Sequence, residues 1–205
     1  MAEKIVIDIF RLKTADQLSK AFAEQGSKLE AGSAAAVSAS HACALAHRAA
    51  LMAQEEIKNN ERLDYMERNL EIVRNYMVFL IDEDVKSRGP IRKAMKIGTE
   101  REIEACIQPA TCIPAEIINM MGQCLGFMDE MCVLCPKDTL HYLAEAAELA
   151  MSAIRSCRIY ILNMLRRSTD ETYIYVTKRE NEIALEESEK LYSSILAKTG
   201  AALFD

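Results

Sequence analysis

The sequence predicts an all-α protein, an antiparallel bundle of about seven helices in one domain spanning residues 1–205. Three observations predict this class. Seven Gly and four Pro in 205 residues leave few points at which a helix must stop. Several long stretches repeat apolar residues at three- and four-residue steps. No stretch shows the sustained alternation, bounded by hairpin turns, that strands require, so packing helix on helix is the economical architecture.

The amino-terminal part predicts one short helix. A short apolar opening, Ile5 to Phe10, precedes Thr14, and Gln17 follows Thr14 at the spacing of a capping box. We expect a helix from this cap to about Glu24. Gly26 and the residues up to Gly32 then form a loop.

The next two segments predict the most regular helices. Ser33 begins an Ala-rich stretch that reaches about Lys58 without Gly or Pro, and its small residues cover nearly the whole circumference. Neighbouring helices can therefore approach it on several sides, which predicts a central helix. The following helix, Leu63 to about Lys86, carries a single inward stripe of apolar residues, namely Leu63, Met66, Leu70, Val73, Met77, Leu80 and Ile81.

Gly and Pro mark the middle of the chain. Arg88-Gly89-Pro90 should interrupt the helix before it, and a short helix from Ile91 to Lys96 should end at Gly98 in a left-handed conformation. The long stretch from Glu100 to Leu134 is helical in pattern. Pro109 and Pro114 each remove a backbone donor, so we expect a kink or a short break there.

Two caps predict the last helices. Asp138 follows Cys135-Pro136-Lys137 and precedes an Ala-rich helix that should run to about Arg167. Asp170 should cap a helix to about Lys198, before Gly200.

Composition and charge exclude several functions. A net charge of −6 lacks the basic field of proteins that bind nucleic acid or anionic membranes. The start, MAEKIVIDIF, has no sustained apolar run, and no later stretch reaches the roughly 18 apolar residues of a membrane span. Seven Cys is an odd number, scattered through helical patterns, which favours reduced thiols. We therefore expect a cytoplasmic protein without nucleic-acid or membrane partners.

Several short motifs occur in a familiar order. Gly32-Ser33 opens the small-residue helix, an acidic group ending at Asp84 closes the next, and Ile113-Pro114 lies inside a later one. Lys137-Asp138 and then Arg158-Ile159 follow. In this order the motifs resemble the cyclodeaminase/cyclohydrolase family. The likeness extends from about Lys28 to Leu165.

The resemblance implies a function in folate one-carbon metabolism. The family includes the cyclodeaminase that converts 5-formiminotetrahydrofolate to the methenyl form with release of ammonia, and bacterial methenyltetrahydrofolate cyclohydrolases. Both are helical and dimeric. A protein similar to them would be a homodimer, would take a tetrahydrofolate derivative with an anionic glutamyl tail as substrate, and would require neither metal nor nicotinamide.

The same resemblance supplies candidate site residues. The reaction turns on a cationic, amidine-like carbon, which a nearby carboxylate would stabilise while shuttling a proton. Asp84 and Asp138 match the family positions for that carboxylate. Lys96 and Arg158 match basic positions that would meet the glutamyl tail, and Gly32 with the amide of Ser33 would orient the ligand at a helix start. Ordinary caps remain the alternative for Ser33 and Asp138, a surface lysine for Lys96, and a solvated acidic cluster for the group at Asp84.

The sequence also departs from the family pattern. Glu30 and Ala31 replace two of three glycines before the serine, and Ser87-Arg88 replaces an Ala-Phe pair. Gly98 replaces a proline, and two asparagines of the last motif become Ser156 and Tyr160. The alternative function is therefore a non-catalytic relative that binds a folate or a protein partner, with Glu30 or Tyr160 plugging the cleft.

Cys132 and Cys135 form a C-x2-C pair with Cys124 before it and His141 after it. A four-ligand zinc site is arithmetically possible. A single pair in an apolar helical context is more typical of buried, reduced cysteines. His41 and His47, six residues apart, do not share a helix face and are expected to be core or surface residues.

Overall fold

The structure, a computed structural model, describes residues 9–204, with side chains to residue 200. Within this range there are helices and no strand, which confirms the predicted all-α class. The seven α-helices are α1 (Ala15–Ala23), α2 (Ala31–Glu56), α3 (Glu61–Ser87), α4 (Gly89–Ile97), α5 (Glu100–Leu134), α6 (Leu140–Leu165) and α7 (Glu171–Phe204). Short 3-10 turns cover Phe10–Leu12 and Lys137–Thr139.

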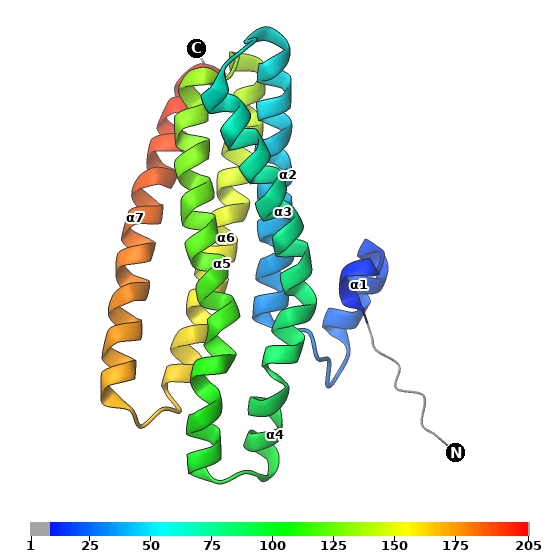
Figure 1. Cartoon of the computed structure of the whole chain (residues 1–205), viewed down its shortest axis with the longest axis vertical. Coiled ribbons are helices and arrows are strands. Elements are labelled where there is room, and N and C mark those ends of the chain that lie inside the picture. Colours follow the sequence, from blue (N-terminus) through cyan, green and yellow to red (C-terminus); the bar gives the residue numbers. More distant parts are fainter. Residues whose placement is uncertain (1–8, 205) are drawn as a thin grey trace.

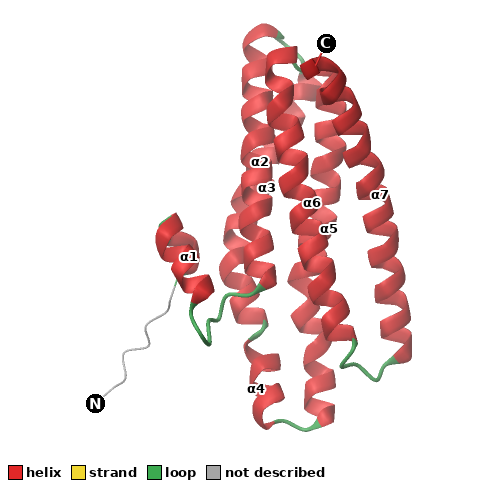
Figure 2. Ribbon diagram, turned by 180° about the vertical axis from the view of Figure 1, so that it is seen from behind, coloured by secondary structure: helices red, strands yellow, loops and turns green. Residues whose placement is uncertain are grey.

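Helices α2, α3, α5, α6 and α7 run up and down beside one another as an elongated antiparallel bundle (Figures 1 and 2). The predicted central helix is confirmed, since α2 packs against α3, α5 and α6. Its alanines explain the close packing, because Ala36, Ala39, Ala42, Ala46 and Ala50 have no exposed surface. None of the helices in residues 9–204 is long and apolar enough to cross a membrane.

The amino-terminal segment contacts the bundle through one buried carboxylate and through the apolar side chains of Phe10 and Ala21, which belong to the core. Helix α1 lies beside the α2–α3 side of the bundle (Figures 1 and 2). Asp82, which is 5% exposed, accepts a hydrogen bond from the backbone N–H of Phe10 at 2.8 Å and one from Arg11 at 3.1 Å. The residues of the apolar opening before Ile9 lie outside the described part of the chain.

Two of the four predicted caps are confirmed. Thr14 and Gln17 form the expected capping box, and Asp170 accepts from the backbone N–H of Tyr173 at 2.9 Å. The cap predicted at Asp138 is wrong, because that residue lies within the 3-10 turn and Thr139 precedes α6. The cap role considered for Ser33 is also wrong, because α2 begins two residues earlier, after Glu30.

Two predictions about Gly and Pro are corrected. Gly98 ends α4 with φ −89° and ψ 166°, an extended conformation rather than the expected left-handed one, and its N–H donates to the Ala94 carbonyl at 2.7 Å. The prediction at the two prolines was a kink or a short break, and the break is absent, because helix α5 continues through both of them. Each proline removes one backbone bond, and the packing of α5 against α3, α6 and α7 outweighs that loss.

Candidate functional site

Ser33 and Asp84 meet where the start of α2 lies against the end of α3. The Ser33 hydroxyl donates to an Asp84 carboxylate oxygen at 2.8 Å and also lies 3.2 Å from the Ile81 carbonyl oxygen. Both side chains are completely buried. Asp82 and Asp84 are thus not the solvated acidic cluster considered from the sequence, and the structure brings together two of the predicted site residues.

Gly32 permits this contact. A Cβ atom at position 32 would lie 2.2 Å from an Asp84 carboxylate oxygen and 2.9 Å from a terminal nitrogen of Arg88. No side chain fits in that space. The glycine retained from the family motif therefore serves the approach of α2 to the buried carboxylate.

Arg88 fills the space beside Asp84. Its Nε lies 2.9 Å from the second Asp84 carboxylate oxygen, an ion pair outside hydrogen-bond geometry, and the side chain is 1% exposed. The guanidinium carbon lies 3.7 Å from the centre of the Tyr160 ring, the distance of a close cation–π contact. Asp84, Arg88 and Tyr160 therefore form one buried stack.

Glu30 closes the stack on its outer side. Its carboxylate accepts a hydrogen bond from Arg88 and an ion pair from Arg92 at 3.4 Å. Arg92 in turn donates to the backbone carbonyls of Lys28 and Val85. The side chain of Glu30 is 38% exposed, so this residue is the boundary between the buried stack and solvent.

Burial dominates the electrostatics of the site. Desolvation raises the pKa of the Asp84 carboxyl, although the Arg88 charge and the Ser33 hydroxyl oppose the shift. Desolvation also raises the pKa of Tyr160 to about 12, so its hydroxyl stays protonated at neutral pH. A carboxyl with a raised pKa is suited to proton transfer, provided that a reactant can reach it.

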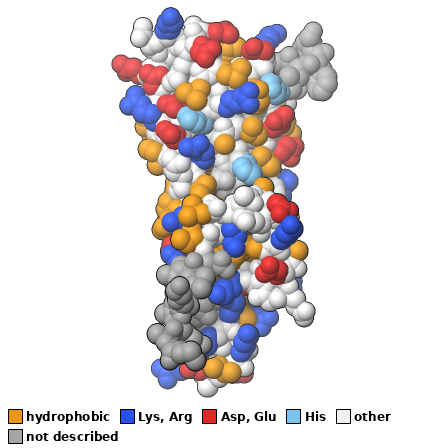
Figure 3. Space-filling model, turned by 90° about the vertical axis from the view of Figure 1, so that its right-hand side faces the viewer, with side chains coloured by type: hydrophobic (Ala, Val, Ile, Leu, Met, Phe, Trp, Pro, Cys, Tyr) orange, Lys and Arg blue, Asp and Glu red, His pale blue; other side chains and the backbone are white. Residues whose placement is uncertain are grey.

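The two predicted basic residues lie apart from the stack. Lys96 is exposed on the last turn of α4, about 12 Å along that helix from Arg88. Arg158 is half-buried on α6, two residues before Tyr160, and its Nε has no hydrogen-bond partner. Helix α4 carries three basic residues and no acidic one. Basic side chains predominate near the lower end of the face in Figure 3, where α4 lies in Figure 1.

Asp138 does not belong to the Asp84 site within this chain. It is exposed, and its neighbour Cys135 packs near the Ala49 carbonyl at 4.0 Å. Ala49 lies 16 residues after Ser33 on α2, which corresponds to about 24 Å along the helix. Asp84 and Asp138 therefore lie toward opposite ends of the bundle.

The three cysteines of the zinc group considered from the sequence, Cys124, Cys132 and Cys135, are buried, as expected. Burial raises the pKa of Cys132 to about 12 and that of Cys135 to about 11. Cys124 instead lies 3.8 Å, sulfur to sulfur, from Cys43. Among the described residues, these thiols are not part of any group with metal-ligand spacing.

Sequence reasoning identified Glu30, Arg88 and Tyr160 as departures without identifying the stack they form. One signal was present, because Asp84 and Arg88 are four residues apart and would share a helix face. The partnership of Arg88 with Tyr160 on α6 depends on tertiary packing. No spacing in the sequence predicts it.

The fold and the site together define a class of protein. Its members are all-helical bundles in which a serine–aspartate pair is buried where two helices meet. The profile of the formiminotransferase-cyclodeaminase family matches residues 14–183. The chain therefore belongs to this family of folate cyclodeaminase-type proteins, as the motifs predicted.

The solved structures agree on the fold. The crystal structure of formiminotetrahydrofolate cyclodeaminase from Thermotoga maritima superposes with a TM-score of 0.87 at 19% identity, covering 94% of this chain and 98% of that one. No curated protein sequence matches the chain.

Proposed function

We propose that this protein binds a one-carbon derivative of tetrahydrofolate, and that cyclohydrolase or cyclodeaminase chemistry at Asp84 proceeds only when Arg88 is displaced. One observation carries the proposal: Asp84 is completely buried and paired with Arg88. Family membership and the retained contact of Asp84 with Ser33 support the reaction class. The Arg88 pair supports the requirement for displacement.

The chemistry explains why Arg88 competes with a substrate. The methenyl and formimino carbons are planar cations of the amidinium type, and a guanidinium is also a planar, delocalised cation. A carboxylate paired with Arg88 is already neutralised and cannot stabilise a second cation in the same place. Arg88 therefore occupies the position that a cationic one-carbon group would need.

Displacement would free the groups that the reaction uses. The Asp84 carboxylate would stabilise the developing charge and carry the proton of the attacking water or departing ammonia. Ser33 would hold the carboxylate in place. Lys96 on the basic helix α4 would meet the anionic glutamyl tail, as would Arg158, whose Nε is unpaired.

The test measures the decay of 5,10-methenyltetrahydrofolate by absorbance, and ammonia release from 5-formiminotetrahydrofolate. We expect slow turnover by the unaltered protein and faster turnover by Arg88→Phe. Glu30→Gln, which loosens only the outer tie of Arg88, should give an intermediate rate and covers the case in which Arg88→Phe does not fold. Asp84→Asn should abolish turnover.

Other outcomes are equally informative. If the unaltered protein turns over fast and Arg88→Phe abolishes that turnover, Arg88 takes part in catalysis. That result would overturn the proposal that Arg88 competes with the substrate. Folate binding without turnover in every variant would establish the second candidate, a non-catalytic relative, which the buried state of Asp84 favours. The variant Asp138→Asn tests the other predicted carboxylate, and we expect its turnover to match that of the unaltered protein.

A further inference from the structure

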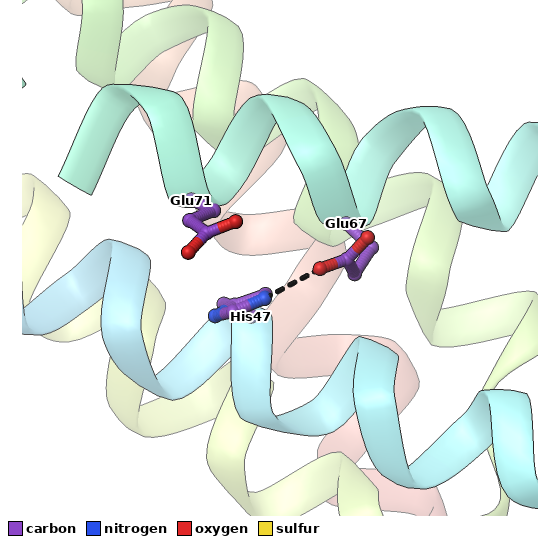
Figure 4. A group of neighbouring side chains, drawn as sticks. All are labelled: His47, Glu67 and Glu71. Carbon is purple, nitrogen blue, oxygen red and sulfur yellow. Dashed lines mark hydrogen bonds and ion pairs between the residues drawn. The ribbon is translucent and has the colours of Figure 1, made fainter. Parts of the chain in front are cut away.

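We infer a divalent metal site between α2 and α3, formed by His47, Glu67 and Glu71. One ligand atom from each residue lies within 4.8 Å of the others (Figure 4). The site is distinct from the Asp84 stack, because Glu67 precedes Asp84 by 17 residues, or about 25 Å along α3.

Helix geometry positions the three groups. Glu67 and Glu71 are four residues apart on α3 and therefore share a face, and His47 points at that face from α2 (Figure 4). The His47 Nε2 lies 2.6 Å from a Glu67 carboxylate oxygen. Both side chains are mostly buried, at 14% and 16% exposure. Glu71, at 49% exposure, leaves the site open to solvent.

The donor set defines the class of ion. One imidazole nitrogen and two carboxylates suit a divalent first-row transition ion, such as manganese, cobalt or zinc, with water in the remaining positions. The two carboxylates would balance the charge of the ion. Ligands about 2.1 Å from an ion lie roughly 3–3.5 Å apart, so rotation of the exposed Glu71 side chain closes the remaining gap.

Two interactions within the described residues compete with an ion for these ligands. Arg74 lies 3.7 Å from a Glu71 carboxylate oxygen, a long ion pair between two partly exposed side chains. Such pairs are weak, so an ion displaces Arg74 at little cost. The hydrogen bond between His47 and Glu67 lies where the ion would bind.

The test titrates the full chain with Co²⁺, whose visible absorption reports its ligands. We expect one equivalent of Co²⁺ without the intense near-ultraviolet absorption of thiolate ligands, which excludes the seven cysteines. His47→Gln and Glu67→Gln should each weaken binding by at least about tenfold, since loss of even an outer-shell partner costs that much. Glu71→Gln, at the surface, should also weaken binding and is the variant least able to disturb folding.

His41→Gln is the matched control, because His41 is an exposed histidine on the same helix but outside the cluster. Its Co²⁺ affinity should equal that of the unaltered protein. Absence of Co²⁺ binding would overturn the inference. A thiolate band at one equivalent, or unchanged binding in both His47→Gln and Glu71→Gln, would overturn it as well.

Discussion

Gly32 shows how one missing side chain determines the geometry of the Asp84 site. We expect Gly32→Ala to destabilise the fold by about 1–3 kcal/mol, because its Cβ would overlap the fixed carboxylate of Asp84. Gly126→Ala is the control, since nothing lies within 4 Å of a Cβ there and alanine favours the helix. Urea unfolding of both variants checks this. Equal stability of the two would contradict the described packing.

Arg88 is a buried charge whose loss should be costly at neutral pH. We expect Arg88→Met to destabilise the protein by about 3–5 kcal/mol, because Asp84 would stay buried without a counter-ion. Burial raises the pKa of Asp84, so the folded state favours its neutral form. The stability that the neutral Asp84 carboxyl contributes is present at low pH, and it is lost as the pH rises through the pKa of Asp84 in the folded protein.

The destabilisation by Arg88→Met should therefore shrink as the pH falls, which chemical unfolding at a series of pH values measures. The double variant Asp84→Leu with Arg88→Met should be more stable than Arg88→Met alone at pH 7. A pH-independent loss would contradict a charged Asp84 as its cause.

At the scale of residues, sequence and structure agree where chemistry is local. Local patterns predicted the caps at Thr14 and Asp170. The motifs identified Ser33 and Asp84 as site residues, and the structure adds their contact. The burial of Arg88 was not predicted, because an arginine at a helix end is usually solvated and only the Tyr160 ring and two carboxylates make its burial favourable. The group around His47 was missed because its residues come from two helices.

Helix α5 offers a test of helix continuity. Pro109 is exposed in the helix interior, where it removes a backbone bond to the preceding turn. Pro109→Ala should stabilise the protein by about 1–3 kcal/mol, near the propensity difference of the two residues. Pro114, which is buried, is the comparison: its replacement also leaves a cavity, so we expect a smaller gain in thermal unfolding.

The start of α5 is tied to the loop between α6 and α7 by Glu104. Hydrogen bonds from the Ser168 hydroxyl and the Thr169 N–H lower the pKa of its carboxyl. A glutamate whose pKa is lowered by folding stabilises the protein at pH values above the ordinary glutamate pKa. That stabilisation is lost as the pH falls through the pKa of the glutamate in the folded protein. Glu104→Gln should therefore lower the urea midpoint at pH 7 and leave it unchanged near pH 3. A loss of equal size at both pH values would assign the effect to packing.

Element boundaries were predicted best where one signal dominates. Helix α3 was expected from Leu63 to Lys86 and runs Glu61–Ser87, because a single apolar stripe defines it. A kink or a short break was expected in helix α5 because local rules at proline were applied without the surrounding helices. The antiparallel bundle was expected from the succession of helical patterns and the absence of strand alternation.

For the whole molecule, the attachment of α1 to the bundle is the feature most open to testing. Asp82 holds Phe10 and Arg11, and we expect Asp82→Ala to release this segment without unfolding α2 to α7. Limited proteolysis should then cut between residues 10 and 30 faster, while the thermal unfolding of the remaining bundle changes little. Cooperative loss of the whole bundle would show that α1 is part of the same folding unit.

If a folate binds at Asp84 as proposed, the Arg88 pair makes the protein its own competitive inhibitor. A side chain on the same backbone competes at an effective concentration set by its tether, which for short connections is in the millimolar range or above. A folate ligand must overcome this occupancy, so its apparent dissociation constant exceeds the intrinsic one by the inverse of the fraction of open molecules. The affinity of the site can thus change through Glu30 or Tyr160, neither of which needs to contact the ligand.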